Sequence, residues 1–218
     1  GGSGADYILG GDGDDTIISG DGDDYIYSDG GDDTVNSGDG NDYVYGGTGT
    51  NIISTGAGED RVNPGATWSI NTIETGDGND RVESLGNYTT NVVDLGAGDD
   101  VASFTYLRGT EDAGSTILTL GSGADTIELP GYSIILKAYS MVTVTDFNTV
   151  EDKLSMTALL ENNSMTGWDG TINPFSTAPG GGYLLLVQSG DDTLLKFDPD
   201  GGGNNLQTMV TFQNTQAS

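Results

Sequence analysis

The feature that most constrains this chain is a nine-residue repeat at its start. Residues 10–18 read "GGDGDDTII" and residues 19–27 read "SGDGDDYIY", nearly the same nine letters twice. The aspartate position of successive copies holds Asp6, Asp15, Asp24, Asp33, Asp42, Asn51 and Asp60. An aliphatic residue follows two places later, at Ile8, Ile17, Ile26, Val35, Val44, Ile53 and Val62. A fixed period over seven copies predicts a repeat architecture.

Each repeat combines a glycine-rich turn with a short strand. Glycine permits the positive φ of tight turns and the close approach of backbone carbonyls. The segments "DTIIS" and "DYIYS" alternate polar and apolar residues, which is the period of a strand with one buried face. Two repeats make one coil, so residues eighteen apart should lie above one another. We therefore predict an all-β fold, a parallel β-roll or β-helix of stacked nonapeptide turns.

The stacking predicts two columns of acidic turns. Asp6, Asp24, Asp42 and Asp60 fall in one column, and Asp15, Asp33 and Asn51 fall in the opposite one. A hard cation held between neighbouring turns would receive carboxylate and backbone carbonyl oxygens, and this flexible oxygen set favours Ca²⁺ over Mg²⁺. We expect about six to eight calcium ions.

The register changes after Asp60, but the turns continue. They reappear as "TGDGNDRVE" (75–83), "LGAGDDVAS" (95–103) and "LGSGADTIE" (120–128). One column therefore continues while the opposite side opens into longer loops near 63–69, 84–90 and 106–115, where we expect few or no ions. The predicted metal ligands are Asp6, Asp12, Asp15, Asp21, Asp24, Asp33, Asp39, Asp42, Asp60, Asp77, Asp80, Asp100 and Asp125, with the glycines Gly4, Gly11, Gly13, Gly20, Gly22, Gly31, Gly38, Gly40, Gly58, Gly78, Gly98 and Gly123.

Charge and missing residue types exclude several functions. The formal net charge is −28, and no Lys or Arg precedes Arg61, so nucleic acid and acidic membranes are poor partners. The chain has no cysteine and no histidine. These absences exclude disulfides, thiolate metal sites, a Ser-His-Asp triad and an HExxH zinc site. We expect this chain to be a piece of a longer protein, cut inside a repeat, and we expect it to be no enzyme.

The repeat resembles the GGxGxDxUx nonapeptide of RTX (repeats-in-toxin) proteins. The stretch "VTVTDFNTVEDKLSMTALL" (142–160) resembles the segment that follows such repeats in proteins exported by type I secretion. Residues 181–213 are similar to the C-terminal target region of large RTX adhesins. The resemblance implies a roll folded around calcium, the type I secretion machinery as a partner, and a secreted or cell-surface location. The repeats depart from the family pattern at Asp29, at Asn51 and in the stretched coils.

We divide the chain into a calcium-binding roll (1–128; regular to 62, stretched over 63–128) and a capping and secretion-target region (129–218). The second region should be a mixed cap, with strands at 133–137 and 141–145 and one short helix within 155–163. A loop follows at 164–182, and then "YLLLVQ", "TLLKFD" and "LQTMVTFQ" predict an antiparallel meander. The uncharged last dozen residues suit a secretion signal or a final strand.

Several features have two interpretations. "DPDGGG" (198–203) is either another calcium loop, through Asp198 and Asp200, or a hairpin turn. Asp146 and Asp152 either bind an ion at the end of the roll or cap backbone groups there. Trp68, Tyr88 and Trp168 either contact a sugar or a surface or pack their loops down. Arg61 and Arg81 should offset acids of neighbouring coils.

The leading function is a non-catalytic module that folds on extracellular calcium and supports type I secretion and surface display of a larger protein, most simply an adhesin. One alternative is a ligand-binding domain for ice or carbohydrate, in contact with a cell or material surface. Another is assembly of a surface layer. A catalytic domain, where a related protein has one, would lie outside these repeats.

Overall fold

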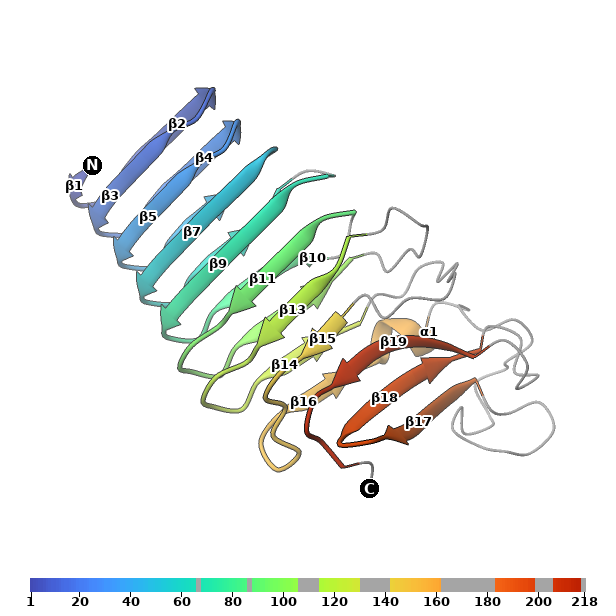
Figure 1. Ribbon diagram of the computed structural model, residues 1–218. Coiled ribbons are helices and arrows are strands. Elements are labelled where there is room, and N and C mark those ends of the chain that lie inside the picture. Colours follow the sequence, from blue (N-terminus) through green and yellow to red (C-terminus); the bar gives the residue numbers. More distant parts are fainter. Residues whose placement is uncertain are drawn as a thin grey trace.

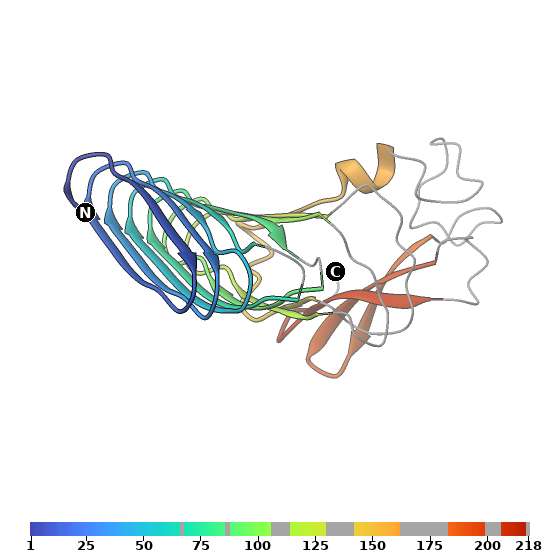
Figure 2. The same cartoon turned by 90° about the horizontal axis from the view of Figure 1, so that it is seen from above.

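The chain folds as a flattened solenoid in which two parallel sheets face each other (Figure 1). The computed structural model describes residues 1–65, 68–85, 88–105, 114–129, 142–161, 183–198 and 206–216. Seen from above, the N-terminal coils lie stacked one behind the next, each closed by a turn on both sides (Figure 2). The predicted all-β parallel roll is confirmed.

The strands alternate between the two sheets along the chain. In spatial order, sheet A contains β1 (Gly2–Ser3), β3 (Thr16–Asp21), β5 (Thr34–Asp39), β7 (Thr50–Ala57), β9 (Ile70–Asp77), β11 (Thr90–Asp94), β13 (Thr116–Thr119), β15 (Val142–Val144), β19 (Gln207–Phe212), β18 (Asp192–Phe197) and β17 (Leu184–Ser189). Sheet B contains β2 (Tyr7–Asp12), β4 (Tyr25–Gly30), β6 (Tyr43–Tyr45), β8 (Arg61–Asn63), β10 (Arg81–Leu85), β12 (Val101–Phe104), β14 (Thr126–Glu128) and β16 (Lys153–Ser155).

Strand register confirms the coil length read from the repeat. Ile8 lies opposite Ile26 in sheet B, and Ile17 lies opposite Val35 in sheet A, in each case eighteen residues apart. The later coils are longer. The offset is 20 residues between the starts of β8 and β10, 25 between β12 and β14, and 27 between β14 and β16. The stretched coils therefore keep the same two sheets and place their extra residues in the connections.

A thin apolar interior separates the sheets. The repeat's aliphatic position supplies one buried side chain from each strand, and all but Ile8 are at most 7% exposed. The members from the regular coils are Ile17, Ile26, Val35, Val44, Ile53 and Val62. Serine and threonine alternate with them, and the Ser37 hydroxyl donates to the carbonyl of Thr55 in the next coil at 3.2 Å. Such a narrow core leaves much of the stabilisation to the turns.

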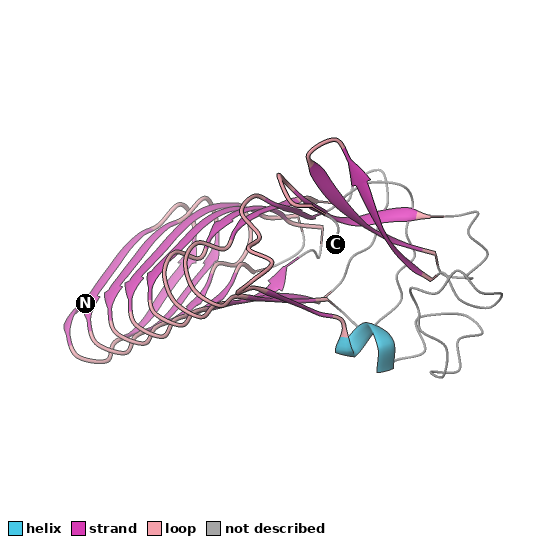
Figure 3. Cartoon of the chain, turned by 90° about the horizontal axis from the view of Figure 1, so that it is seen from below, coloured by secondary structure: helices cyan, strands magenta, loops and turns pink. Residues whose placement is uncertain are grey.

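The C-terminal region continues the solenoid before it changes character. β15 pairs with β13 and β16 pairs with β14, both in parallel, so they form the last coil. β19 then joins β15 in parallel, and β18 and β17 complete the predicted antiparallel meander (Figure 3). Phe147 packs against Phe212 with ring centroids 4.8 Å apart, which ties the last coil to the meander. The strand β16 was not predicted, because its three residues form a strand only through pairing with β14.

The short helix is confirmed as α1 (Thr157–Glu161), within the predicted range. The expected strand at 133–137 and loop at 164–182 lie outside the described residues. The 141–145 strand is present as β15. Within the described part of the chain, no helix has the length and apolarity needed to cross a bilayer.

Candidate metal centre

The first column of turns places one aspartate at the entry to each strand of sheet B. We call Asp6, Asp24, Asp42, Asp60, Asp80, Asp100 and Asp125 the first column. The backbone N–H of Asp24 donates to Oδ1 of Asp42 at 2.8 Å, and that of Asp42 donates to Oδ1 of Asp60 at 2.8 Å. The same bond links every neighbouring pair of the column. Each carboxylate therefore reaches back to the coil before it, as the predicted stacking requires.

In the first column from Asp24 to Asp125, the second carboxylate oxygen has no protein hydrogen-bond partner. Asp24, Asp42 and Asp60 are at most 2% exposed, yet the Oδ2 atom of each is buried without a hydrogen bond. Among the described residues, the side chains that share this property are Asp15, Asp24, Asp33, Asp42, Asp60, Asp80, Asp100 and Asp125. An unpaired buried carboxylate oxygen is costly, so these atoms require a positive partner.

Titration behaviour supports this requirement. Burial raises the pKa of Asp100 to about 7, and it raises the pKa values of Asp60 and Asp125 to about 6. Backbone hydrogen bonds oppose the rise in pKa. Neighbouring carboxylates of the column add to it at Asp60 and Asp100, and Asp152, Asp146 and Asp99 add to it at Asp125. The chain alone therefore disfavours a fully ionised column, and a cation between successive turns would remove that penalty.

Glycine makes room for the backbone beside each carboxylate. Gly40 and Gly58 lie two residues before Asp42 and Asp60 and adopt φ values of 139° and 144°. A Cβ on Gly58 would overlap the carbonyl oxygen of Gly40 in the preceding coil. The predicted glycines of this column thus bring backbone carbonyls close to the aspartates, and the donor set of carboxylate and carbonyl oxygens fits a hard cation.

The second column changes its chemistry along the solenoid. It begins with Asp15 and Asp33, and the N–H of Asp15 donates to Oδ1 of Asp33 at 3.0 Å. From the third coil onward, amides and then a hydroxyl replace the carboxylates, at Asn51, Asn71, Asn91 and Thr116. We call these six residues the second column.

Its asparagines form a ladder. Nδ2 of Asn51 donates to Oδ1 of Asn71 at 3.2 Å, and Nδ2 of Asn71 donates to Oδ1 of Asn91 at 2.9 Å. Both groups of the Asn71 amide are used, because Oδ1 accepts from Asn51 while Nδ2 donates to Asn91 and to Oγ of Ser69. Asn71 and Asn91 could not be identified from the nonapeptide alone, because the longer coils shift them out of the nine-residue phase.

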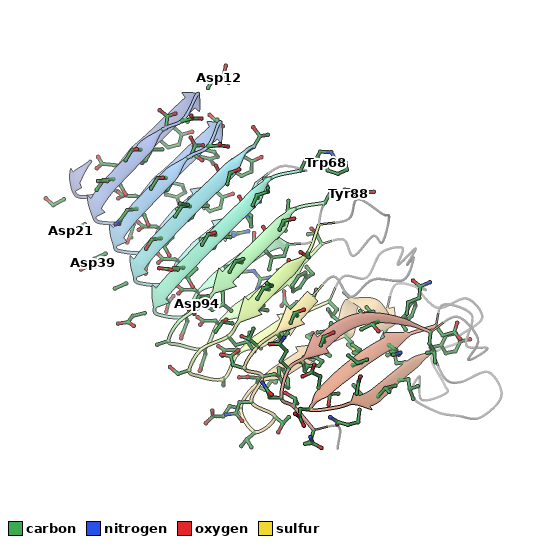
Figure 4. All side chains as sticks on the ribbon, in the orientation of Figure 1. Asp12, Asp21, Asp39, Trp68, Tyr88 and Asp94 are labelled. Atoms are coloured by element: carbon green, nitrogen blue, oxygen red, sulfur yellow. The ribbon has the colours of Figure 1, made fainter. Side chains whose placement is uncertain are left out.

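The third turn position holds predicted ligands that face outward. Asp12, Asp21, Asp39 and Asp77 are all exposed, and Figure 4 shows Asp12, Asp21 and Asp39 at the rims of the turns. The structure does not bring their carboxylates together with the buried ones, since no three acidic side chains converge anywhere in the described ranges. A site at these turns therefore relies on backbone carbonyls for most of its oxygens.

The fifth turn position was missed from the sequence. Oδ1 of Asp14 accepts the backbone N–H of Asp32 at 2.9 Å, and Oδ1 of Asp32 accepts that of Thr50 at 2.7 Å. The same forward bond recurs at Asp23, Asn41, Asn79 and Asp99. The sequence signal that could have identified it is the Asp or Asn directly before the repeat's aspartate position, as in the "DD" and "ND" pairs.

Asp152 follows the first column, at the entry to β16, and backbone N–H groups of the protein satisfy its carboxylate. Oδ1 of Asp152 accepts the N–H of Asp125 at 3.2 Å, and its Oδ2 accepts the N–H of Asn148 at 2.7 Å. Asp146 likewise accepts from the N–H groups of Leu120 and Gly121. Of the two interpretations, capping of backbone groups describes Asp146 and Asp152. Asp198 is fully buried, and Asp200 lies outside the described residues.

Arg61 and Arg81 pair with acids, in part across coils as expected. Arg61 lies 2.7 Å from Glu83, and Arg81 contacts both Glu83 at 2.8 Å and Glu128 at 2.6 Å. These pairs lie on sheet B, outside the turn columns. Asp29, which replaces a turn glycine, adopts a left-handed φ of 70° and so keeps the turn geometry.

Two stacked columns of glycine and aspartate on a parallel solenoid define a repeat protein that binds cations at its turns. The family model described as "RTX calcium-binding nonapeptide repeat (4 copies)" matches residues 1–35 and 36–67. These residues belong to the RTX calcium-binding repeats, and the chain carries a calcium-binding module. No curated protein matches the chain.

Proposed function

We propose that this chain is a module that folds on extracellular calcium and supports type I secretion and surface display of a larger protein, with an adhesin as the best fit. The observation that carries the calcium requirement is the row of buried Oδ2 atoms without partners. Bound calcium would supply the positive charge that these atoms lack, and it would accept about six to eight oxygen ligands from the turns. The residues to hold it are the first column, the glycines before it, and Asp15 and Asp33.

Charge makes folding depend on the ion. A net charge of −28 with carboxylates stacked in columns opposes compaction, and the thin core offers little compensation. Where free calcium is about ten times the Kd of a site, binding stabilises the folded state by about 1.4 kcal/mol per ion. On the order of seven such sites would add about 10 kcal/mol, comparable with the whole stability of a domain.

The same dependence supports export as an unfolded chain. Extracellular calcium modules bind at about 10⁻⁴ to 10⁻³ M, so little of that stabilisation exists where calcium is scarce. The chain would stay unfolded during passage through the secretion channel and fold outside. The resemblance of residues 142–160 and 181–213 to segments of type I secreted proteins supports this assignment.

The C-terminal region would serve as the cap. β19, β18 and β17 add a meander to the end of sheet A, so that the stacked strands do not end in a bare parallel edge. We assign residues 129–218 to capping and secretion targeting. We assign no catalytic role to the chain, since its buried acids are engaged in turn structure and it has no histidine.

The test is circular dichroism during a calcium titration, with magnesium as the control ion. Strand signal should be low in excess chelator and should appear cooperatively with calcium, while magnesium should leave it low. A strand-rich spectrum in chelator would contradict calcium-dependent folding. Secretion is tested separately by fusing residues 129–218 to a reporter in a host with a type I system; a reporter that stays inside would contradict the targeting role.

A further inference from the structure

The third turn position of the second column changes from acidic to aromatic along the solenoid. Strand register aligns Gly30 with Thr48. Thr48, Trp68 and Tyr88 each lie three residues before an asparagine of the ladder, and the Trp68 N–H bonds to the Tyr88 carbonyl of the next coil. Asp12 begins this row at the N-terminal end. The change follows the replacement of carboxylates by the asparagine ladder at the inner position. The turns that have Asn71 and Asn91 at the buried inner position, in place of an aspartate, have Trp68 and Tyr88 at the outer position.

The two aromatic residues are held in an uncommon backbone conformation. Trp68 has a φ of 76° and Tyr88 a φ of 59°, in the left-handed region that bulky residues rarely adopt. Such strain persists only where the surrounding structure enforces it, and it is concentrated at functional positions.

The asparagine ladder provides that enforcement. Nδ2 of Asn71 donates to Oγ of Ser69, directly after Trp68, and Nδ2 of Asn91 donates to Oγ1 of Thr89, directly after Tyr88. The N–H of Trp68 also donates to the carbonyl of Tyr88 at 3.2 Å. Buried amides therefore fix the loop at both rings.

The rings are displayed rather than buried. Trp68 stacks on Tyr88 with centroids 5.1 Å apart and planes 28° from parallel, yet 64% of Trp68 remains exposed. Figure 4 shows both side chains at the margin of the solenoid, beyond the ends of β9 and β11. Since Tyr88 covers one face of the indole, the exposed area belongs largely to its other face. The residue at the same turn position in the preceding coil is the small, exposed Thr48. Packing of the loop onto the core therefore does not account for Trp68.

The surroundings select an uncharged ligand. Residues 62–73 and 84–93 contain no Asp, Glu, Lys or Arg, in a chain of net charge −28. The negative field of the whole molecule repels anionic polymers. Acids on this side of the described solenoid lie in earlier coils, such as Asp32, whose Oδ1 already accepts the N–H of Thr50, so the stretches around Trp68 and Tyr88 themselves offer no carboxylate to a cation. The negative π-face of an indole attracts polarised C–H groups, and a sugar ring presents a face of such groups with hydroxyls at its edge.

We propose that Trp68 and Tyr88 form a binding platform for a ring of a neutral glycan, which stacks on the open face of the Trp68 indole. The platform is separate from the calcium columns and needs calcium only for the coils to be folded. It is an open shelf on the side of a stacked solenoid, which suits a glycan chain on a surface better than a small molecule enclosed in a pocket.

The test uses the calcium-loaded full chain carrying W168F, so that Trp68 is the only indole. Cellohexaose, maltohexaose and chitohexaose are titrated while indole fluorescence is followed. We expect a saturable change with at least one of them. In affinity gels that contain the corresponding polysaccharide, W68A should weaken binding by about tenfold or more and Y88A by less. W168A is the matched control and should bind as the parent does.

A second variant keeps both rings. Thr48→Arg places a guanidinium beside the open face of the indole, where it should stack and block the sugar. W68A and Thr48→Arg should show the parent's calcium-dependent circular dichroism, because Trp68 and Thr48 lie outside the core. An absent response to all three oligosaccharides, or unchanged retention of W68A, would overturn the proposal. Dimerisation in sedimentation velocity that W68A abolishes, without any sugar response, would also overturn it in favour of self-association.

Discussion

The two turn columns solve one structural problem with different chemistry. Both fill the space beneath each turn and hydrogen-bond each coil to the coil before it. The first column uses carboxylates that accept through Oδ1 and leave Oδ2 unpaired, whereas the asparagines at 51, 71 and 91 use both an acceptor and a donor. A carboxylate can only accept, so a column of them needs an external cation. An amide does both, and a ladder of amides completes itself.

This difference divides the solenoid into two zones. Over residues 1–50 both columns are acidic, while over the stretched coils only the first column is. We therefore expect the regular coils to depend most on calcium, because in the stretched coils hydrogen bonds between protein groups join the turns of the second column.

The largest expected effect is that of removing calcium. Excess chelator should abolish backbone protection in residues 1–50 first, because each turn on both sides there loses about 1.4 kcal/mol. Hydrogen exchange with mass spectrometry measures this by segment. The asparagine-bearing strands β9 and β11 should exchange later than β3 and β5. Simultaneous loss of protection in all coils would show that the two columns do not differ in calcium dependence.

Closing the space beside one carboxylate should have the next largest effect. Gly58→Ala places a Cβ against the Gly40 carbonyl at a φ of 144°. We expect a loss of about 3 kcal/mol or more in unfolding free energy with calcium present, and one bound ion fewer. Urea denaturation and calorimetric stoichiometry measure the two quantities. Gly190→Ala, in the hairpin between β17 and β18 with open space at the Cβ, is the control that should leave the stoichiometry unchanged.

Exchanging amide for acid tests the ladder directly. Asn71→Asp removes the bond to Asn91 and buries a charge beside a turn without the glycine pattern, at a cost of about 2 kcal/mol that calcium should not restore. Asn51→Asp, flanked by Gly47 and Gly49, should instead be rescued by calcium with one additional ion bound. If calcium restores the stability of both variants equally, the turn at Asn71 binds calcium as readily as the turn at Asn51, and the asparagine ladder does not mark a region without calcium sites.

The stability of the calcium-free protein should depend on pH. Because burial raises the pKa of Asp100 to about 7 from 3.8, the folded column binds protons more tightly than the unfolded chain does. Its contribution to metal-free stability is full below about pH 4 and is lost as the pH rises through about 7. Thermal unfolding in chelator should therefore show a higher Tm at pH 5 than at pH 7.5. Calcium affinity should show the opposite trend, and a pH-independent metal-free Tm would contradict the raised pKa values.

The smallest effect should come from the outer ion pairs. Arg61→Ala removes an exposed contact with Glu83, for a loss of about 0.5 kcal/mol or less in urea denaturation. Arg81→Ala, which breaks two contacts, serves as the paired comparison and should cost slightly more. A loss of several kcal/mol from Arg61→Ala would mean that the charge on sheet B, and not the turn columns, controls stability.

The repeat was enough to predict most of the fold. The phase of Asp24 and Ile26, and of their equivalents, predicted which side chains enter the interior and which coils lie in contact, because the period of the turn and the two-residue period of the strand leave one way to stack. The meander was predicted for a similar reason, since its strands alternate locally. The strand β16 was missed because its three residues become a strand only beside β14.

The candidate site likewise has a part that the sequence predicted and a part that it did not. The aspartates of the first column could be identified from spacing alone. The orientation of the third-position carboxylates toward solvent, the forward bonds of Asp14 and Asp32, and the self-satisfied Asp152 could not, because they depend on which neighbouring N–H each oxygen meets.

By itself the sequence determined a stacked, acidic, all-β solenoid with calcium-binding repeats, because a strict nonapeptide period places its aspartates and its aliphatic residues in register from coil to coil. Only the tertiary structure showed where along the solenoid the stacked aspartates of the second column give way to other side chains. Asn71 and Asn91 become a ladder, and Trp68 and Tyr88 become a displayed pair, through contacts between coils twenty residues apart. Those contacts exist once the coils are stacked, and the local sequence of a single turn does not contain them.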